Sequence, residues 1–109
     1  TKDVLTSMEK DTKSKINLLK VDGGASNNNY LMQFQSNILG IKIERPQNTE
    51  VTALGAAYIA GLLCSFWDIN HLKNLKYDKE NFNPKFSSDK INKLYQNWNK
   101  AVKRSMNWI

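Results

Sequence analysis

Length, composition and charge limit what this 109-residue chain can be. It is 40% hydrophobic and 24% charged, which is typical of a globular rather than a disordered protein. A single cysteine excludes an internal disulfide and a cysteine-based metal cluster, and no apolar run is long enough to span a membrane, so we expect a cytoplasmic protein.

The first part of the chain predicts helices and strands that alternate. Apolar residues recur every three or four positions in the segments expected to be helical, and short apolar runs mark two strands. Gly40 is expected to stop one helix and Thr49 to cap the next. The expected elements are a helix over 3–10, a strand over 16–21 with both faces mostly buried, a helix from Asn28, a strand over 41–44 ended by Pro46, and a helix over 49–63.

The second part predicts one long helix and little else. Residues 66–86 are expected to hold a short helix in FWDINHLKNL, followed by an irregular YDKENFNPKF. Ser87 can cap the final helix, whose apolar stripe comprises Ile91, Leu94, Tyr95, Trp98, Ala101, Val102, Ser105 and Ile109. Because two short strands make a poor sheet, we expect an α/β fold with an incomplete sheet and flanking helices, whose other strands lie outside this chain.

The stretch VDGGASNNN, residues 21–29, stands between a strand and a helix. Glycines there let another group approach the backbone closely, and a helix start favours negative charge such as phosphate. The alternative is an ordinary tight turn, because the stretch is neither GxGxxG nor a Walker loop. Asp22 could be a base or a metal ligand, but bonding to the backbone N–H groups of the turn is the favoured interpretation for a lone acid.

LLKVDGGASNNNYLMQFQSNILGIKIERPQNTEVTALGAAYIAG, residues 18–61, resembles the C-terminal domain of the FGGY carbohydrate kinases. The hydrophobic-x-GG unit and the TALGAA helix are shared across that family, and NNYLMQFQSNILG followed by ERP resembles its glycerol-phosphorylating branch rather than the xylulokinase-like or gluconokinase-like ones. The resemblance covers residues 1–109 and implies the nucleotide-side lobe of an actin/hexokinase-like (ribonuclease H-like) ATPase domain, with the N-terminal domain absent.

The resemblance also implies roles for individual residues. Gly24 would lie against ATP or ADP with Gly23 beside it, Ala25 would keep the backbone close, and Asn28 would contact the nucleotide. The TALGAA helix resembles an interdomain helix. The catalytic base, the Mg²⁺ ligands and the glycerol site match segments outside these residues, so this chain alone is expected to be inactive. The full-length enzyme would be a homodimer or higher homo-oligomer that binds neither nucleic acid nor membrane.

Other residues favour structural roles. His71 lacks partners for a metal or a catalytic triad and is expected to be solvated or half-buried. Cys64 is expected to be a buried, inert thiol, and Trp67, Trp98 and Trp108 to pack in a core or domain contact. The alternatives to a glycerol-phosphorylating enzyme are another FGGY sugar or polyol kinase and a basic interaction module without catalysis, because the final helix carries several lysines.

Overall fold

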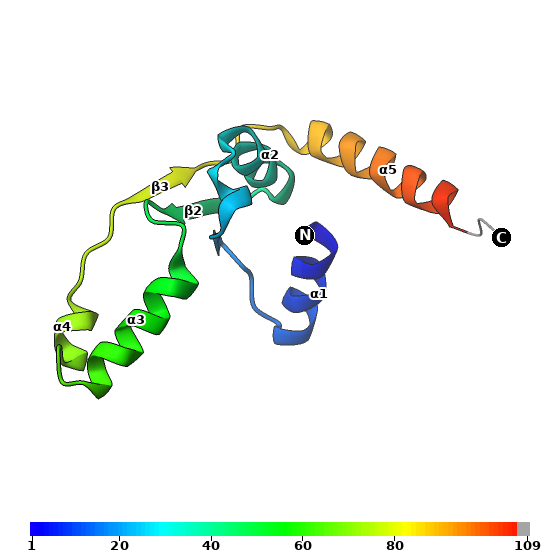
Figure 1. The fold of residues 1–109 in the computed structure, drawn as a ribbon. Helices are drawn as coiled ribbons and strands as arrows, with labels where there is room; N and C mark the ends of the chain where they lie inside the picture. Colours follow the sequence, from blue (N-terminus) through cyan, green and yellow to red (C-terminus); the bar gives the residue numbers. More distant parts are fainter. Residues whose placement is uncertain (107–109) are drawn as a thin grey trace.

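A computed structural model of the chain describes residues 1–106 and shows helices connected by a small mixed sheet (Figure 1). Trp108 and Ile109, which the sequence assigns to packing and to the final helical stripe, lie outside the described residues. The elements are α1 (Lys2–Thr12), β1 (Leu18–Lys20), the 3₁₀ turn η1 (Gly24–Asn27), α2 (Asn29–Leu39), β2 (Lys42–Pro46), α3 (Val51–Leu63), α4 (Ile69–Lys73), β3 (Lys79–Phe82) and α5 (Ser88–Ser105).

The sheet has the order β1-β2-β3, with β1 and β2 parallel and β2 and β3 antiparallel. The register places Leu19 opposite Ile43 and Ile43 opposite Phe82, so one apolar residue from each strand lies in a single row. Side chains in such a row share a face of the sheet, because residues alternate between faces along a strand. That face packs against α2.

The third strand corrects the expectation that YDKENFNPKF is irregular. Only Phe82 among the four residues of β3 is a strand-forming apolar residue, so the segment carries no alternating pattern. Its pairing with β2 is reinforced by two cross-strand ion pairs, Arg45–Glu80 and Lys79–Glu44. Such pairs depend on residues about 35 positions apart, which a local pattern does not reveal.

The core lies on one side of the sheet. Ile43 is fully buried, Met32 and Phe82 are nearly so, and Leu19, Val21, Leu31 and Leu39 pack around them. The expectation that the first strand is mostly buried on both faces is wrong, since Leu18 is 39% exposed. Leu18 points to the face of the sheet opposite the one that packs on α2. Within residues 1–106, β1 pairs only with β2, so its other edge is not covered by a strand.

Helix ends confirm the expected caps at α2 and α5 but not at α3. Gly40 adopts a left-handed conformation with φ 71° at the end of α2, and the Ser87 hydroxyl accepts from the Lys90 N–H at the start of α5. Thr49 does not cap α3, contrary to expectation. Its backbone carbonyl instead accepts from Gly23, and Asn48 Oδ1 accepts from the Glu50 N–H at 2.9 Å.

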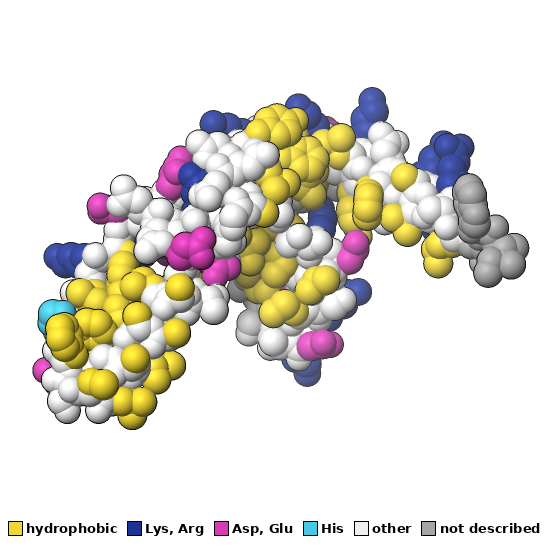
Figure 2. Space-filling model, viewed as in Figure 1, with side chains coloured by type: hydrophobic (Ala, Val, Ile, Leu, Met, Phe, Trp, Pro, Cys, Tyr) yellow, Lys and Arg dark blue, Asp and Glu magenta, His cyan; other side chains and the backbone are white. Residues whose placement is uncertain are grey.

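The described chain is extended. Its radius of gyration is 18.4 Å, whereas a compact domain of this length has about 13 Å. In Figure 1, the arm formed by α3 and α4 (residues 51–73) and the helix α5 leave the sheet in opposite directions. Figure 2 shows hydrophobic side chains gathered on the arm, where Ile59, Leu63 and Phe66 are exposed. Trp98 on α5, which the sequence assigns to a core or a domain contact, is 58% exposed and packs in no core within residues 1–106.

Candidate functional site

The turn after β1 is built around Gly23. Its φ of 76° and ψ of 168° lie in a region that is essentially restricted to glycine. Its N–H donates to the Thr49 carbonyl at 3.1 Å, and its carbonyl accepts from both the N–H of Ser26 at 3.0 Å and its hydroxyl at 2.7 Å. Gly23 is therefore needed for the path of the backbone.

The backbone conformation at position 24 does not require glycine. Its φ lies outside the left-handed region, and a Cβ built there would meet nothing within 4 Å. Gly24 and the next residue, Ala25, are both exposed, so the backbone of η1 faces open space. A planar or charged ligand could reach this backbone without displacing any side chain.

Asn28 lies at the junction of η1 and α2. Its Oδ1 accepts from the Leu31 N–H at 3.0 Å and caps α2. Its side-chain NH₂ donates no hydrogen bond within residues 1–106, so one half of the amide serves the helix and the other half faces solvent. The four residues assigned by resemblance to the nucleotide, Gly23, Gly24, Ala25 and Asn28, are thus brought together on one exposed turn.

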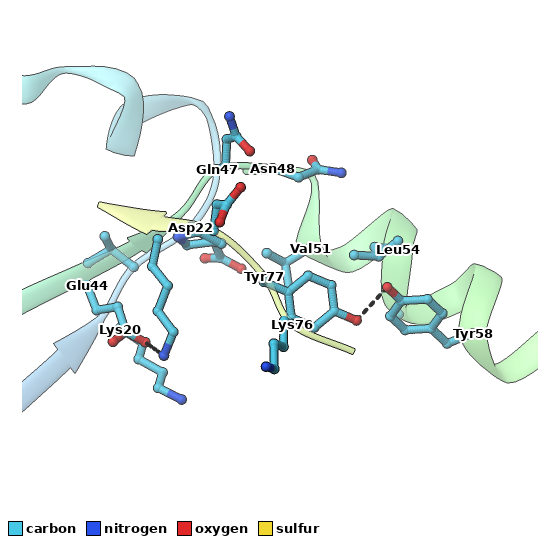
Figure 3. Close-up of a pocket in the computed structure, with 15 residues that line it drawn as sticks. Lys20, Asp22, Glu44, Gln47, Asn48, Val51, Leu54, Tyr58, Lys76 and Tyr77 are labelled. Atoms are coloured by element: carbon cyan, nitrogen blue, oxygen red, sulfur yellow. Dashed lines mark hydrogen bonds and ion pairs between the residues drawn. The ribbon is translucent and has the colours of Figure 1, made fainter. Parts of the chain in front are cut away.

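The prediction that Asp22 holds the turn is wrong. Its carboxylate makes no hydrogen bond within the described part of the chain, and it points instead toward a neighbouring groove (Figure 3). The turn is held instead by Ser26, whose hydroxyl donates to the Gly23 carbonyl. It is also held by Arg45 on β2, whose guanidinium donates to the Ser26 carbonyl. The sequence analysis did not predict a role for Arg45 in the turn. The one available signal was that Arg45 is one of only two arginines among the 16 Lys and Arg residues of the chain.

A groove of about 650 Å³ lies beside the turn, at the carboxyl ends of β1 and β2 (Figure 3). Its apolar wall comes from Val21, Pro46, Val51 and Leu54, and the Lys79–Glu44 ion pair lies at its edge. None of the four residues assigned to the nucleotide lines this groove. The groove and the exposed turn are therefore adjacent but separate surfaces.

Two tyrosine hydroxyls close the far side of the groove. Tyr58 on α3 and Tyr77 before β3 lie 2.6 Å apart, oxygen to oxygen (Figure 3). This hydrogen bond, followed by a smaller effect of burial, holds the pKa of Tyr77 above its ordinary value of 10.0. The hydrogen bond between Tyr58 and Tyr77 links α3 to the segment that leads into β3.

We expect Tyr58→Phe to lower the pKa of Tyr77 toward its ordinary value. A raised tyrosine pKa favours the neutral phenol in the folded chain, so this stabilisation is complete below pH 10 and is lost as the pH rises through the folded pKa. NMR titration of labelled tyrosines would measure the change, with Tyr95→Phe as the control because Tyr95 bonds to Asp3 elsewhere. An unchanged Tyr77 pKa in Tyr58→Phe would contradict the assignment.

The remaining candidates have no role in the turn. His71 is exposed on α4, as expected, and residues 1–106 contain no cluster of three or more His, Cys, Asp or Glu side chains that could hold a metal. Cys64 is exposed, so the expectation of a buried thiol is wrong: it follows the end of α3, where the arm turns away from the core. Among the described helices, none is long and apolar enough to cross a membrane.

Comparison with known proteins gives both a family and a fold. The model of the C-terminal domain of the FGGY family of carbohydrate kinases matches residues 1–64. The crystal structure of Plasmodium falciparum glycerol kinase with ADP superposes with a TM-score of 0.76 and 36% identity, over 99% of this chain and 22% of that one. This likeness confirms the expected α/β fold, an incomplete sheet with flanking helices from an actin/hexokinase-like ATPase C-terminal domain.

Curated relatives align along nearly the whole chain. It is 53% identical to the glycerol kinase of Malacoplasma penetrans (strain HF-2) over 107 residues, 97% of this chain and 21% of the relative. It is 52% identical to the glycerol kinase of Thermoanaerobacter sp. (strain X514) over 110 positions, 99% of this chain and 22% of the relative. The chain thus spans about a fifth of the length of the curated relatives it matches.

Proposed function

Because the chain belongs to the FGGY family of carbohydrate kinases, we propose that it is part of a glycerol kinase and supplies one side of the adenine-nucleotide site. The observation that carries the proposal is the exposed turn over residues 23–28, in which Gly24 leaves the backbone open. The likeness to a glycerol kinase with ADP, at 36% identity, supports ADP or ATP as the ligand of this turn.

In the proposed reaction, a glycerol hydroxyl attacks the γ-phosphoryl group of ATP and yields sn-glycerol 3-phosphate and ADP. Catalysis of phosphoryl transfer is mostly positioning and charge stabilisation. The part played by this chain is positioning: Gly24 and Ala25 lie against the nucleotide, with Gly23 setting their path. The free NH₂ of Asn28 donates to the nucleotide while its oxygen keeps α2 capped.

The groups that perform the transfer are proposed to lie outside these residues. Mg²⁺ would neutralise phosphate charge when bound, through oxygen ligands. Residues 1–106 contain no group of three or more His, Cys, Asp or Glu side chains that could hold a metal ion, so we assign no Mg²⁺ ligand to them. The catalytic base and the glycerol contacts are proposed to lie in other segments of the full-length enzyme. In the same proposal the 109 residues alone do not turn over glycerol, and the full-length enzyme is a cytoplasmic homo-oligomer.

We expect Gly24→Val in the full-length protein to weaken ADP binding by tenfold or more, because the new side chain occupies the space where nucleotide meets backbone. The melting temperature should change little, since Gly24 is exposed and its φ lies outside the left-handed region. Calorimetric titration with ADP, together with thermal unfolding, measures both. Equal ADP affinity in Gly24→Val and wild type would contradict a nucleotide site at the turn.

Two further variants sharpen this test. Asn28→Ser keeps a capping oxygen but removes the NH₂ group, so ADP affinity should fall while α2 stays capped. Asn27→Ala is the matched control, because the Asn27 amide points to the Thr49 hydroxyl at 3.5 Å. Binding that ignores Gly24 and Asn28, but is abolished by salt and extends to other polyanions, would favour a basic interaction module instead.

A further inference from the structure

Arg45 joins the glycine turn to the strands β2 and β3 behind it. It lies on β2, and its side chain is only 11% exposed although it carries a permanent charge. Burying a charged guanidinium costs free energy unless its N–H groups are hydrogen-bonded, so the partners of Arg45 indicate its role. Two of its hydrogen-bond acceptors, on Ser26 and Asn29, lie in the turn or directly after it.

Three acceptors from three elements converge on this guanidinium. Nη1 donates to the backbone carbonyl of Ser26 inside η1. Nη2 donates to Asn29 Oδ1, at 2.8 Å, on the first residue of α2, and to the carboxylate of Glu80 on β3. The guanidinium also lies over the Phe82 ring, 5.3 Å from its centroid, which ties it to the buried core.

Ser26, which Arg45 contacts, is itself hydrogen-bonded to Gly23. Ser26 is 2% exposed, and both its N–H and its hydroxyl bond to the Gly23 carbonyl. A chain of hydrogen bonds therefore runs from Glu80 through Arg45 and Ser26 to Gly23. The contact with Asn29 fixes the other end of the turn, one residue after Asn28.

We propose that Arg45 is a positioning residue for nucleotide binding, held by Glu80, that clamps both ends of the 23–28 turn. The inference rests on the proposed function, because it assigns Arg45 a role in presenting Gly24, Ala25 and Asn28 to ADP or ATP. Lysine is not expected to replace it, because a single ammonium lacks the rigid, planar spread of N–H donors with which the guanidinium reaches acceptors on three elements. Arg45 itself need not touch the nucleotide.

The test compares Arg45→Lys with wild type in the full-length protein. A displaced turn should raise the Kd for ADP and the KM for ATP about tenfold, because small misplacements of binding groups have large effects. The KM for glycerol should stay within twofold, since the proposed glycerol site lies elsewhere. A merely structural role would lower the melting temperature and the amount of active protein without separating these two KM values.

The matched control breaks the other ion pair between the same two strands. Lys79→Met removes the Lys79–Glu44 pair, which joins β2 and β3 at 3.1 Å but does not touch the turn. Its ADP affinity should equal that of wild type. Glu80→Met keeps Arg45 but removes the carboxylate that it contacts, and should raise the Kd for ADP severalfold, less than Arg45→Lys does. This variant keeps the test available if Arg45→Lys fails to fold.

The outcomes separate the two proposals. A wild-type protein that binds ADP, beside Arg45→Lys and Glu80→Met variants of equal affinity, would overturn the role of Arg45 alone. A wild-type protein that binds no ADP would overturn the proposed function and this inference with it. A tenfold loss in Arg45→Lys, with a normal glycerol KM and a normal Lys79→Met, would establish the clamp.

Discussion

Ile43→Ala is expected to lower the free energy of unfolding by about 2–5 kcal/mol, the usual cost of truncating a fully buried aliphatic side chain. Ile43 is 0% exposed and sits at the centre of the row in which β1, β2 and β3 meet α2. The buried hydrophobic residues of residues 1–106 are only Met32, Ile43 and Phe82. With so few buried residues around it, a cavity at Ile43 could not be filled by rearrangement of the core.

Urea unfolding followed by circular dichroism would measure this change. Ile43→Val should cost only about 0.5–1.5 kcal/mol, because it removes a single methylene. Leu18→Ala is the matched control on the same sheet, since Leu18 points to the opposite face and is 39% exposed; it should cost less than about 1 kcal/mol. Equal losses in Leu18→Ala and Ile43→Ala would show that the packed face has been assigned wrongly.

Gly61→Ala and Gly55→Ala should change stability in opposite directions, although both glycines lie within α3. Alanine normally stabilises a helix interior by about 0.8–1.0 kcal/mol relative to glycine. At Gly55 a Cβ meets nothing within 4 Å, so this gain should appear in full. At Gly61 the Cβ would lie 2.3 Å from ring atoms of Trp67, which must move away.

Moving Trp67 has a larger cost than the helix gain. Overpacking costs about 1–3 kcal/mol, and the Trp67 Nε1–H would lose its 3.0 Å hydrogen bond to the Tyr58 carbonyl. We therefore expect a net loss of about 1–3 kcal/mol in Gly61→Ala. Thermal unfolding gives the sign for each variant, and Trp67 fluorescence, isolated with Trp98→Phe and Trp108→Phe, reports whether the ring has moved. A stabilised Gly61→Ala would disprove this packing.

Local chemistry allowed the sequence to predict the turn and the helix that follows it. Asn28 and Gly40 bound α2 because an amide cap and a left-handed glycine are properties of single residues. The α/β alternation followed from periodicity, and the exposed turn followed from the glycines. The specific contacts of Gly24 and Asn28 with nucleotide stay a prediction.

What the sequence could not predict depends on residues distant along the chain. The strand β3 has no pattern of its own and is held by partners on β2. The Tyr58–Tyr77 pair and the Arg45 contacts likewise join segments that only the fold brings together. Cys64 was mispredicted because neighbouring apolar residues suggested burial, whereas the arm around it is largely exposed.

The convergence on Arg45 has a consequence for how such sequences diverge. The Ser26 carbonyl belongs to a residue that is 2% exposed, so losing its donor would leave a buried acceptor unpaired, at a cost of about 1–3 kcal/mol. The side chains at positions 29, 45 and 80, which make these contacts, are then not free to drift independently. In an alignment of glycerol kinases, substitutions at position 45 should be rare on their own and should accompany changes in the turn or at position 80.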